Sequence, residues 1–507
     1  MMDGEYRIFL RESTGLVKEV GFWDAVSINV ANMSIGTALA TIGFTLAVLP
    51  TVAGANLVYA SLIAALFSLP QVIVYSILIR YIPRVGGDYV WLGRALGPRL
   101  AWLTSGLVLG FIIQDLAYYA LVAIAAVFQL ESVLPILGIH ITINTWLSIV
   151  IASAFFTVIV LANILGTKYG IKLMMVLTTV SIIGLITAIT IFFITPRVQA
   201  INAISSLLPA GYAYSRITND YAGPTLSIDT ILMLLPFFAI YVYPWLNAGP
   251  AISAEIKGKK AINWNIPIAF ILTLALLTLG FEAMYYSLGF KFVTAALSNP
   301  NLNGIINFWT MAMAISSNYV LKWLIGISSI TWYLSLLTYG AIIPIRYWFA
   351  LAFDRVWPSA FAHLSPRFGT PIYAHIFDLA ITTILIVLTG IFYGIFTALY
   401  GATIGALIYF LAIGVAALMM SLRDSFNMSG LIRLILSVSG VLQTVIMAYL
   451  MYQFIEYPGI WGGNWLAYGV VIGSIFLGII TFLLSRYINK RRYGIDISVV
   501  YTEIPPE

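Results

Sequence analysis

The sequence predicts an all-α protein that crosses a lipid bilayer many times. Of its 507 residues, 61% are hydrophobic and only 9% are charged, whereas a soluble domain carries about 25% charged residues. Long apolar runs recur along the chain, and the positive charges gather in alternate gaps between them. These observations predict a polytopic membrane protein, and they account for the formal net charge of +6 without a nucleic-acid partner.

A helix needs about 20 apolar residues to cross the hydrocarbon core of a bilayer. Runs of that length predict twelve membrane-spanning helices, at 25–50, 56–80, 100–128, 141–164, 172–195, 229–253, 266–290, 319–345, 374–392, 395–419, 431–454 and 465–486. A stretch near 303–317 predicts a further short helix outside the membrane.

The basic residues predict the orientation, because cytoplasmic loops are enriched in Lys and Arg. With the N-terminus in the cytoplasm, all but four of the 25 Lys and Arg residues lie on the inner side. The four on the outer side are Arg197, Arg216, Lys291 and Lys322. An even number of spans returns the C-terminus to the cytoplasm, so we expect a multi-pass protein of the cell membrane with both termini inside.

Two of the predicted spans carry helix-breaking or polar residues in mid-span. The span 229–253 contains Pro244, Asn247, Gly249 and Pro250, although proline removes a backbone donor and water cannot satisfy freed carbonyls in hydrocarbon. The span 25–50 contains Asn29, Asn32, Ser34, Gly36 and Thr37. A plain kink is the alternative explanation for either span taken alone.

The two interrupted spans open two groups of five, as in transporters built from inverted repeats. The expected organisation is a cytoplasmic segment 1–24, a first repeat 25–195, an outer loop 196–228, a second repeat 229–419, two further spans in 420–486, and a cytoplasmic tail 487–507. Half-helix ends leave N–H groups and carbonyls unpaired. Such N–H groups bind an anion, and the carbonyls bind an ammonium group, so a pair of broken helices predicts a clamp for an amino acid.

Three loop segments resemble signatures of the amino acid–polyamine–organocation (APC) superfamily of permeases. They read "IPRVGGDYVWLGRALGPRLAW" from Ile82, "SAEIKGKKAINWNIPIAF" from Ser253, and "IRYWFALAFDRVWPSAFAHLSPRFGTPIYA" from Ile345. The resemblance covers roughly residues 20–486 and implies a leucine-transporter-like fold of five plus five inverted spans with two appended. The family's "G-S-G-I-F" is "IGTALA" here, and its "R-D-G" is "FDR"; these departures bear on substrate identity.

The resemblance also implies site residues. It implies that the backbone N–H groups of Ser34, Ile35, Gly36 and Thr37 bind the substrate carboxylate, and that carbonyls near Tyr241, Val242 and Tyr243 bind the ammonium group. A large aromatic residue of this segment closes over the substrate in such proteins, with Tyr243 as first choice and Trp245 as second; packing in the core or against lipid is the alternative.

Charged residues predict further roles. Asp115 lies in mid-span, where an ionisable group is costly and points to function. It is a candidate for proton coupling or for anchoring a cationic substrate, and a structural hydrogen bond is the alternative. Asp88 is a candidate for an inner gate with Arg84 or Arg94, with Tyr243 as a further gate candidate.

The coupling ion is open between Na⁺, H⁺ and none. Proton-coupled relatives carry a lysine in the fifth span, where this chain has Ser181. Related sodium sites use hydroxyls of the eighth span, which makes Ser335 and Thr338 the candidates for holding Na⁺. No other cofactor is expected.

The favoured interpretation is a secondary active transporter of amino acids or related amines that works by alternating access. The alternatives are a substrate exchanger or polyamine transporter of the same fold, a channel, and an amino acid sensor that does not transport. An enzyme is not expected, because the three histidines lie in loops or at span ends and no metal-binding or nucleotide-binding motif is present. Oligomeric state is left open.

Overall fold

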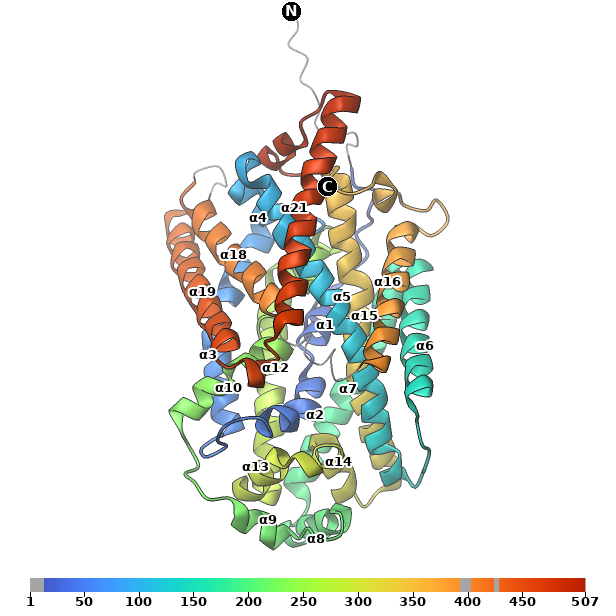
Figure 1. Ribbon diagram of the computed structural model, residues 1–507, viewed down its shortest axis with the longest axis vertical. Helices are drawn as coiled ribbons and strands as arrows, with labels where there is room; N and C mark the ends of the chain where they lie inside the picture. The colour runs from blue at the N-terminus through green and yellow to red at the C-terminus, as the bar shows by residue number, and fades with distance from the viewer. Residues whose placement is uncertain (1–12, 393–402, 424–427, 507) are drawn as a thin grey trace, which may run out of the picture.

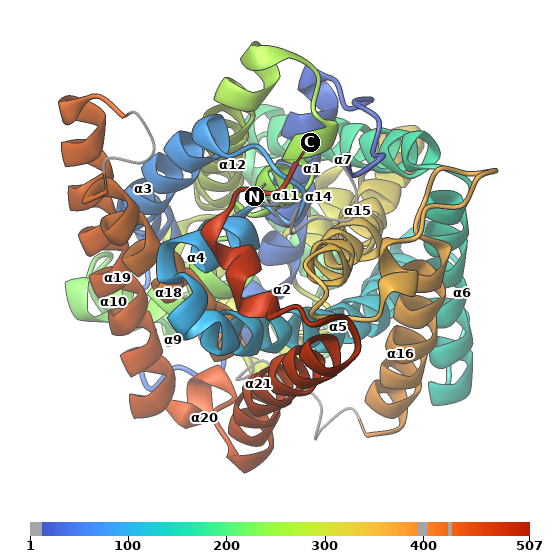
Figure 2. The ribbon, with the colours of Figure 1, turned by 90° about the horizontal axis from the view of Figure 1, so that it is seen from above.

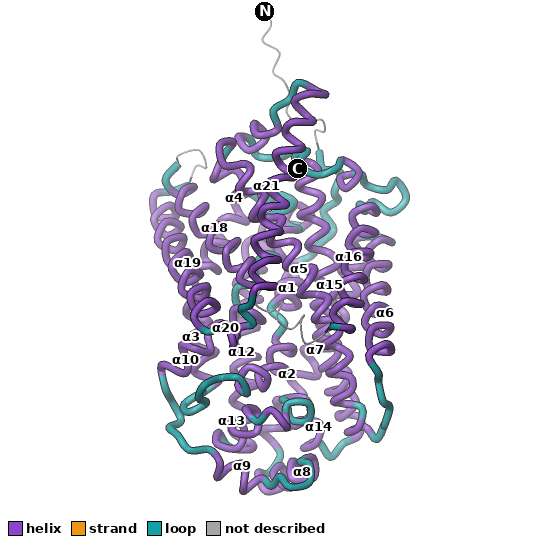
Figure 3. The backbone as a smooth tube through the Cα atoms, viewed as in Figure 1, coloured by secondary structure: helices purple, strands orange, loops and turns teal. Residues whose placement is uncertain are grey.

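The computed structural model describes residues 13–392, 403–423 and 428–506. Within these residues the chain forms helices and loops and no β-strand (Figure 3). Residues 1–12 and 507 of the predicted cytoplasmic segments, and residues 395–402 of the tenth predicted span, lie outside the described residues.

The helices follow the predicted spans in order. The first predicted repeat contains α1 (Phe22–Asn32), α2 (Ile35–Leu46), α3 (Leu57–Tyr81), α4 (Asp88–Leu96), α5 (Ala101–Val133), α6 (Thr145–Ile164) and α7 (Thr167–Ile194). The loop after it contains α8 (Arg197–Leu207) and α9 (Tyr214–Asp220).

The second predicted repeat contains α10 (Ile228–Tyr241), α11 (Ala248–Ala251), α12 (Gly258–Leu288), α13 (Phe290–Ser298), α14 (Phe308–Ile315), α15 (Tyr319–Phe353), α16 (Ile372–Ile391) and α18 (Ile404–Ser421). The chain then forms α19 (Gly430–Glu456), α20 (Pro458–Trp461), α21 (Trp465–Tyr493) and a 3₁₀ turn, η8 (Ile497–Thr502). The short helix predicted near 303–317 is α14.

Eleven helical segments in the described part of the chain are long and apolar enough to cross a membrane. The sixth predicted span is represented by α10, which is apolar but shorter, because the chain leaves the helix at Val242. An all-helical membrane protein is therefore confirmed, while the number of crossings and the inverted repeat stay predictions.

The helices differ in how much of their surface the protein itself covers. In the most apolar window of Phe22–Leu46, 94% of the residues are buried, against 28% for Trp465–Tyr493. Figure 2 accordingly places α2 and α15 in the interior and α6, α16, α19 and α21 at the edge. The exposed residues of the outer helices are largely apolar, such as Leu431, Val445 and Phe476, as expected for a surface in contact with lipid.

The two ends of the molecule are built differently. Figure 1 places α4 and the C-terminal segment at one end, and α8, α9, α13 and α14 at the other. We call the first the terminal end and the second the helical-loop end. A short β-bridge between Val20 and Ile256 ties the chain before α1 to the chain after α11.

The eighth span differs from its prediction in length. The sequence predicts a span that ends at residue 345, but α15 continues to Phe353. Arg346 does not end the helix because its guanidinium is buried in an ion pair with Glu255, with an Nε–Oε1 distance of 2.8 Å. A charge that finds its partner inside the protein is a poor signal of a membrane boundary.

Candidate substrate site at the two broken helices

The first predicted interruption separates α1 from α2. Helix α1 ends at Asn32, and Met33 and Ser34 connect it to Ile35. The side chains here suit a break, since Asn and Ser compete for backbone hydrogen bonds. The first intrahelical bond of α2 runs from Ala38 N to Ser34 O, so the helix itself uses none of the N–H groups from Ser34 to Thr37.

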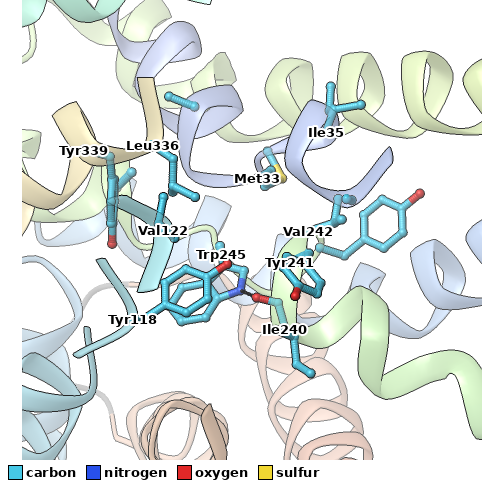
Figure 4. Packing of buried hydrophobic residues seen from close by; sticks show 14 of the residues in the cluster. Met33, Ile35, Tyr118, Val122, Ile240, Tyr241, Val242, Trp245, Leu336 and Tyr339 are labelled. Atoms are coloured by element: carbon cyan, nitrogen blue, oxygen red, sulfur yellow. Dashed lines mark hydrogen bonds between the residues drawn. The ribbon is translucent and has the colours of Figure 1, made fainter. Parts of the chain in front are cut away.

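The second interruption is longer. Helix α10 ends at Tyr241, and an irregular segment, 242–247, leads to α11. Pro244 has no N–H with which to continue the helix. The indole Nε1 of Trp245 turns back and donates to the carbonyls of Ala239 at 3.1 Å and Ile240 at 2.8 Å (Figure 4), which satisfies part of the helix end.

Asparagine side chains hold the two breaks side by side. Asn32 Nδ2 donates to the carbonyl of Trp245 at 2.9 Å and to Asn247 Oδ1 at 3.1 Å. Asn29 Oδ1 accepts from Gly249 N at 2.9 Å, and its Nδ2 donates to Asn265 Oδ1 at 2.8 Å. Both predicted interruptions are therefore confirmed as breaks in helix, and the structure brings them together.

Apolar and aromatic side chains surround the paired breaks. Figure 4 shows Met33 and Ile35 from the first break, Tyr118 and Val122 from α5, Leu336 and Tyr339 from α15, and Ile240, Tyr241, Val242 and Trp245 from the second. The rings of Trp245 and Tyr118 stack with their centroids 6.1 Å apart. This wall suits an apolar part of a small molecule.

A cavity of about 500 Å³ reaches this region from the helical-loop end. Its floor includes Ile240, Tyr241 and Tyr333, and its polar lining residues are Thr41, Thr45, Gln129, Ser132, Asn303 and Asn307. None of its lining residues carries a formal charge. The cavity has room for an amino acid, and its lining includes Asn303, Gly304 and Asn307 of the helical-loop end.

The terminal end is closed by packed polar groups. Gly86 N donates to the carbonyl of Ala251 at 2.9 Å, and Gly87 adopts φ +43°, with its Cα against the backbone of Pro250 where any Cβ would clash. Asp88 follows directly and is fully buried. The two glycines of the "GGDY" motif thus let the loop seal against α11.

The gate candidates have other partners than the sequence suggested. Asp88 accepts hydrogen bonds from three tyrosine hydroxyls, while Arg94 forms an ion pair with Asp354 at 3.0 Å. Arg84 donates from Nε to the carbonyl of Pro505 at 2.7 Å. No spacing pattern in the sequence connects these tyrosines, because they come from three separate helices.

The aromatic residues of the second break that are candidates for closing over the substrate lie in two different places. Tyr243 is fully buried, its hydroxyl lies 2.7 Å from Ser61 Oγ, and its ring stacks on Phe238, which directs it to α3. Tyr241 and Trp245 are the members of this segment that border the cavity or its wall.

The candidate ion-binding hydroxyls do not form one cluster. Ser181 Oγ lies 2.8 Å from Thr331 Oγ1. Ser335 and Thr338 donate within their own helix, to the carbonyls of Trp332 and Leu334. Nor do the described residues contain any group of three His, Asp or Glu side chains placed to hold a metal ion.

Asp115 is fully buried in α5, and neither of its carboxylate oxygens makes a hydrogen bond within the described part of the chain. The structural hydrogen bond that is the alternative role for Asp115 is therefore not seen among the described residues. A buried carboxylate without a hydrogen bond lowers the stability of the folded protein.

A comparison with protein families finds that residues 20–476 match the model of a family described as amino acid permease. No curated protein matches the chain. The family match spans both broken helices and all three loop segments with which the sequence resemblance began.

Proposed function

The chain belongs to the amino acid permease family, and from that premise we propose that it is a secondary active transporter that binds its substrate between the two broken helices. Membership makes it a multi-pass membrane protein of amino acid transport, in a family of transporters rather than enzymes. The site, the substrate class and the mechanism are our proposals.

One observation supports this substrate site most directly. Asn32, at the end of α1, bonds to Trp245 and Asn247 in the second break, and the adjacent end of α10 lines a cavity through Ile240 and Tyr241. The N–H groups of Ser34, Ile35, Gly36 and Thr37 bind the substrate carboxylate, because a helix N-terminus attracts an anion. Carbonyls of Tyr241, Val242 and Tyr243 bind the ammonium group, and Tyr241 and Trp245 close over the substrate.

The walls support a neutral substrate with an apolar side chain. Phe44, Phe128 and Ile240 are among the apolar residues that line the cavity, and none of its lining residues carries a formal charge. A charged substrate side chain would lose hydration here with no opposite charge to replace it. We therefore expect amino acids such as L-leucine and L-phenylalanine.

A specific observation favours a second candidate. Asp115 is a buried carboxylate without a hydrogen bond in the described part of the chain, and an organic amine or polyamine that reached it would neutralise it. This alternative predicts a cationic substrate, which distinguishes it from the first.

The direction follows from basic-residue distribution. We place the terminal end in the cytoplasm of a cell membrane, since nearly all Lys and Arg lie on that side. The cavity then opens outward and the structure is the state ready to accept substrate from outside. Alternating access requires a second state, open to the cytoplasm, in which α11 and the "GG" loop separate.

Uptake by the purified protein in proteoliposomes tests the proposal. Radiolabelled L-leucine and L-phenylalanine should accumulate, with L-arginine, L-glutamate and putrescine excluded. Binding without accumulation would instead indicate a sensor, and uptake only into vesicles preloaded with amino acid would indicate an exchanger. Uptake of putrescine alone would favour the Asp115 alternative.

A further inference from the structure

Asp88 is a buried carboxylate that accepts hydrogen bonds from three tyrosine hydroxyls. Its Oδ1 accepts from Tyr347 at 2.6 Å and from Tyr409 at 3.0 Å, and its Oδ2 accepts from Tyr75 at 2.8 Å. These tyrosines come from α15, α18 and α3, so one carboxylate connects three membrane helices to α4. Buried carboxylates are normally paired with a cation, but none of the described Lys or Arg side chains forms an ion pair with Asp88.

A short chain of hydrogen bonds joins Asp88 to the candidate substrate site. Asn247, in the second break, donates to the hydroxyl of Tyr347 at 3.1 Å, and that hydroxyl donates to Asp88. Asn247 also accepts from Asn32 of the first break. Any movement of the breaks when substrate binds therefore reaches Asp88 through a single tyrosine hydroxyl.

We infer that Asp88 is a proton-binding site that couples amino acid uptake to an inward proton gradient. This inference rests on the proposed function and names its coupling ion. In the state closed to the cytoplasm, a proton from outside converts the carboxylate to the neutral acid, and one tyrosine hydroxyl turns from donor to acceptor. When the "GG" loop opens, water reaches Asp88 and the same proton leaves to the cytoplasm. No other bond forms or breaks.

The burial of Asp88 determines which of the two states, closed or open to the cytoplasm, binds the proton more tightly. Asp88 lies outside the membrane-spanning helices, at the start of α4, and burial raises its pKa to about 6 even though the three tyrosines oppose the shift. A solvent-exposed aspartate has a pKa of about 4. The closed state therefore binds the proton on the order of 100-fold more tightly than the open one. The bound proton stabilises the closed state relative to the open state. This stabilisation is fully present below about pH 4 and is lost as the pH rises through about 6.

Other titratable groups lie near Asp88. Tyr339 is connected to Asp88 only indirectly, through Asn247 and Tyr347. Asp115 of α5 lies within electrostatic range of Asp88. On α4 itself, Tyr89 and Arg94 are both engaged with Asp354. Asp115 is the one other carboxylate in this set without an ion pair, so it must be tested beside Asp88.

The test uses full-length protein in proteoliposomes with radiolabelled L-leucine outside and a pH-sensitive dye inside. The wild type should accumulate leucine when the outside is acidic, acidify the interior as it does so, and gain activity as the external pH falls through about 6. Asp88→Asn should lose gradient-driven accumulation at least about tenfold, which removes about 1.4 kcal/mol of driving free energy, yet keep leucine counterflow.

Matched variants separate the possible results. Asp378→Asn removes another fully buried aspartate, on α16, and should keep proton-driven uptake. If Asp88→Asn does not fold, Tyr347→Phe removes only the connecting hydroxyl and should lower the number of protons per leucine while keeping counterflow. Unchanged proton coupling in that variant would overturn the inference.

The inference and the proposed function fail in different ways. Leucine uptake by the wild type without proton entry would overturn the inference and leave the transporter standing. Proton-driven accumulation retained by Asp88→Asn, or lost only in Asp115→Asn, would also overturn it. Absence of any amino acid binding, counterflow or uptake by the wild type would refute the proposed function itself.

Discussion

Gly36 contributes its lack of a side chain as much as its N–H group. Its Cα lies against the indole of Trp332, where an added Cβ would overlap the ring. Its carbonyl accepts from Trp309 Nε1 at 2.9 Å. The first turn of α2 is therefore pressed between two tryptophans, which fixes the direction in which its N–H groups point.

Gly36→Ala should lower leucine uptake at least about tenfold, because the methyl group must displace Trp332 at a cost of about 1–3 kcal/mol. Proteoliposome uptake measures the effect, with size-exclusion chromatography to show that the protein still folds. Gly473→Ala, in α21, meets open space and should transport normally. Full activity of Gly36→Ala would contradict the proposed carboxylate site.

Asn32 should be as sensitive, for a different reason. Asn32→Ala removes the donor to Trp245 O and Asn247 Oδ1 and leaves two buried acceptors unsatisfied, at a cost of about 1–3 kcal/mol. We expect a raised KM for L-leucine and a lower melting temperature. Asn163→Ala, at a buried asparagine whose side chain donates to Ile159 of its own helix, should leave the KM unchanged. A normal KM in Asn32→Ala would contradict its role in joining the breaks.

At the scale of single residues, the sequence predicts backbone behaviour better than side-chain partners. Pro244 and the polar residues near Gly36 marked both breaks, because their effect on a helix is local. The direction of Tyr243 toward Ser61, and the three tyrosines on Asp88, depend on helices far apart in the chain and have no local pattern. The asparagines stood out as polar residues in apolar runs, but their partners did not.

At the scale of elements, the C-terminal segment is a structural part of the terminal end. Tyr501 is buried, its hydroxyl lies 3.1 Å from that of Tyr89, and its ring covers Gly93. Burial raises the pKa of Tyr501, so the hydroxyl stays protonated and can donate. Arg94 Nε donates to the carbonyl of Glu503 at 2.7 Å. The sequence predicted only a cytoplasmic tail here, since a polar segment after the last span shows no docking pattern.

Tyr501→Ala should therefore loosen α4. Loss of a buried aromatic ring costs about 3–5 kcal/mol, and we expect a lower melting temperature by intrinsic fluorescence. Tyr493→Ala is the matched control, because Tyr493 is mostly exposed and its removal should leave the melting temperature unchanged. An unaltered melting temperature in Tyr501→Ala would show that the segment does not hold α4.

At the scale of the whole molecule, the pattern of closure sets the direction of the proposed cycle. A cavity at the helical-loop end meets the breaks, while the terminal end is sealed by Gly86, Asp88 and the ion pairs of Arg94 and Arg346. Apolar runs and charge bias predicted the spans and their orientation, since both act through the bilayer. The open end depends on a small free-energy difference between two packings of the same helices. No sequence pattern predicts that difference.

Alternating access can be followed with single cysteines, because the chain has none of its own. Ser132→Cys lies in the cavity lining and Ser253→Cys is buried at the terminal end. Without substrate, a membrane-impermeant maleimide should label the first from outside and not the second from inside. Because substrate shifts the population toward the state open to the cytoplasm, L-leucine should slow labelling of Ser132→Cys and speed that of Ser253→Cys. Ser205→Cys, on the exposed surface of α8, should label at the same rate throughout. Simultaneous labelling of both positions would indicate a channel, and rates unaffected by any transported amino acid would rule out the two-state cycle.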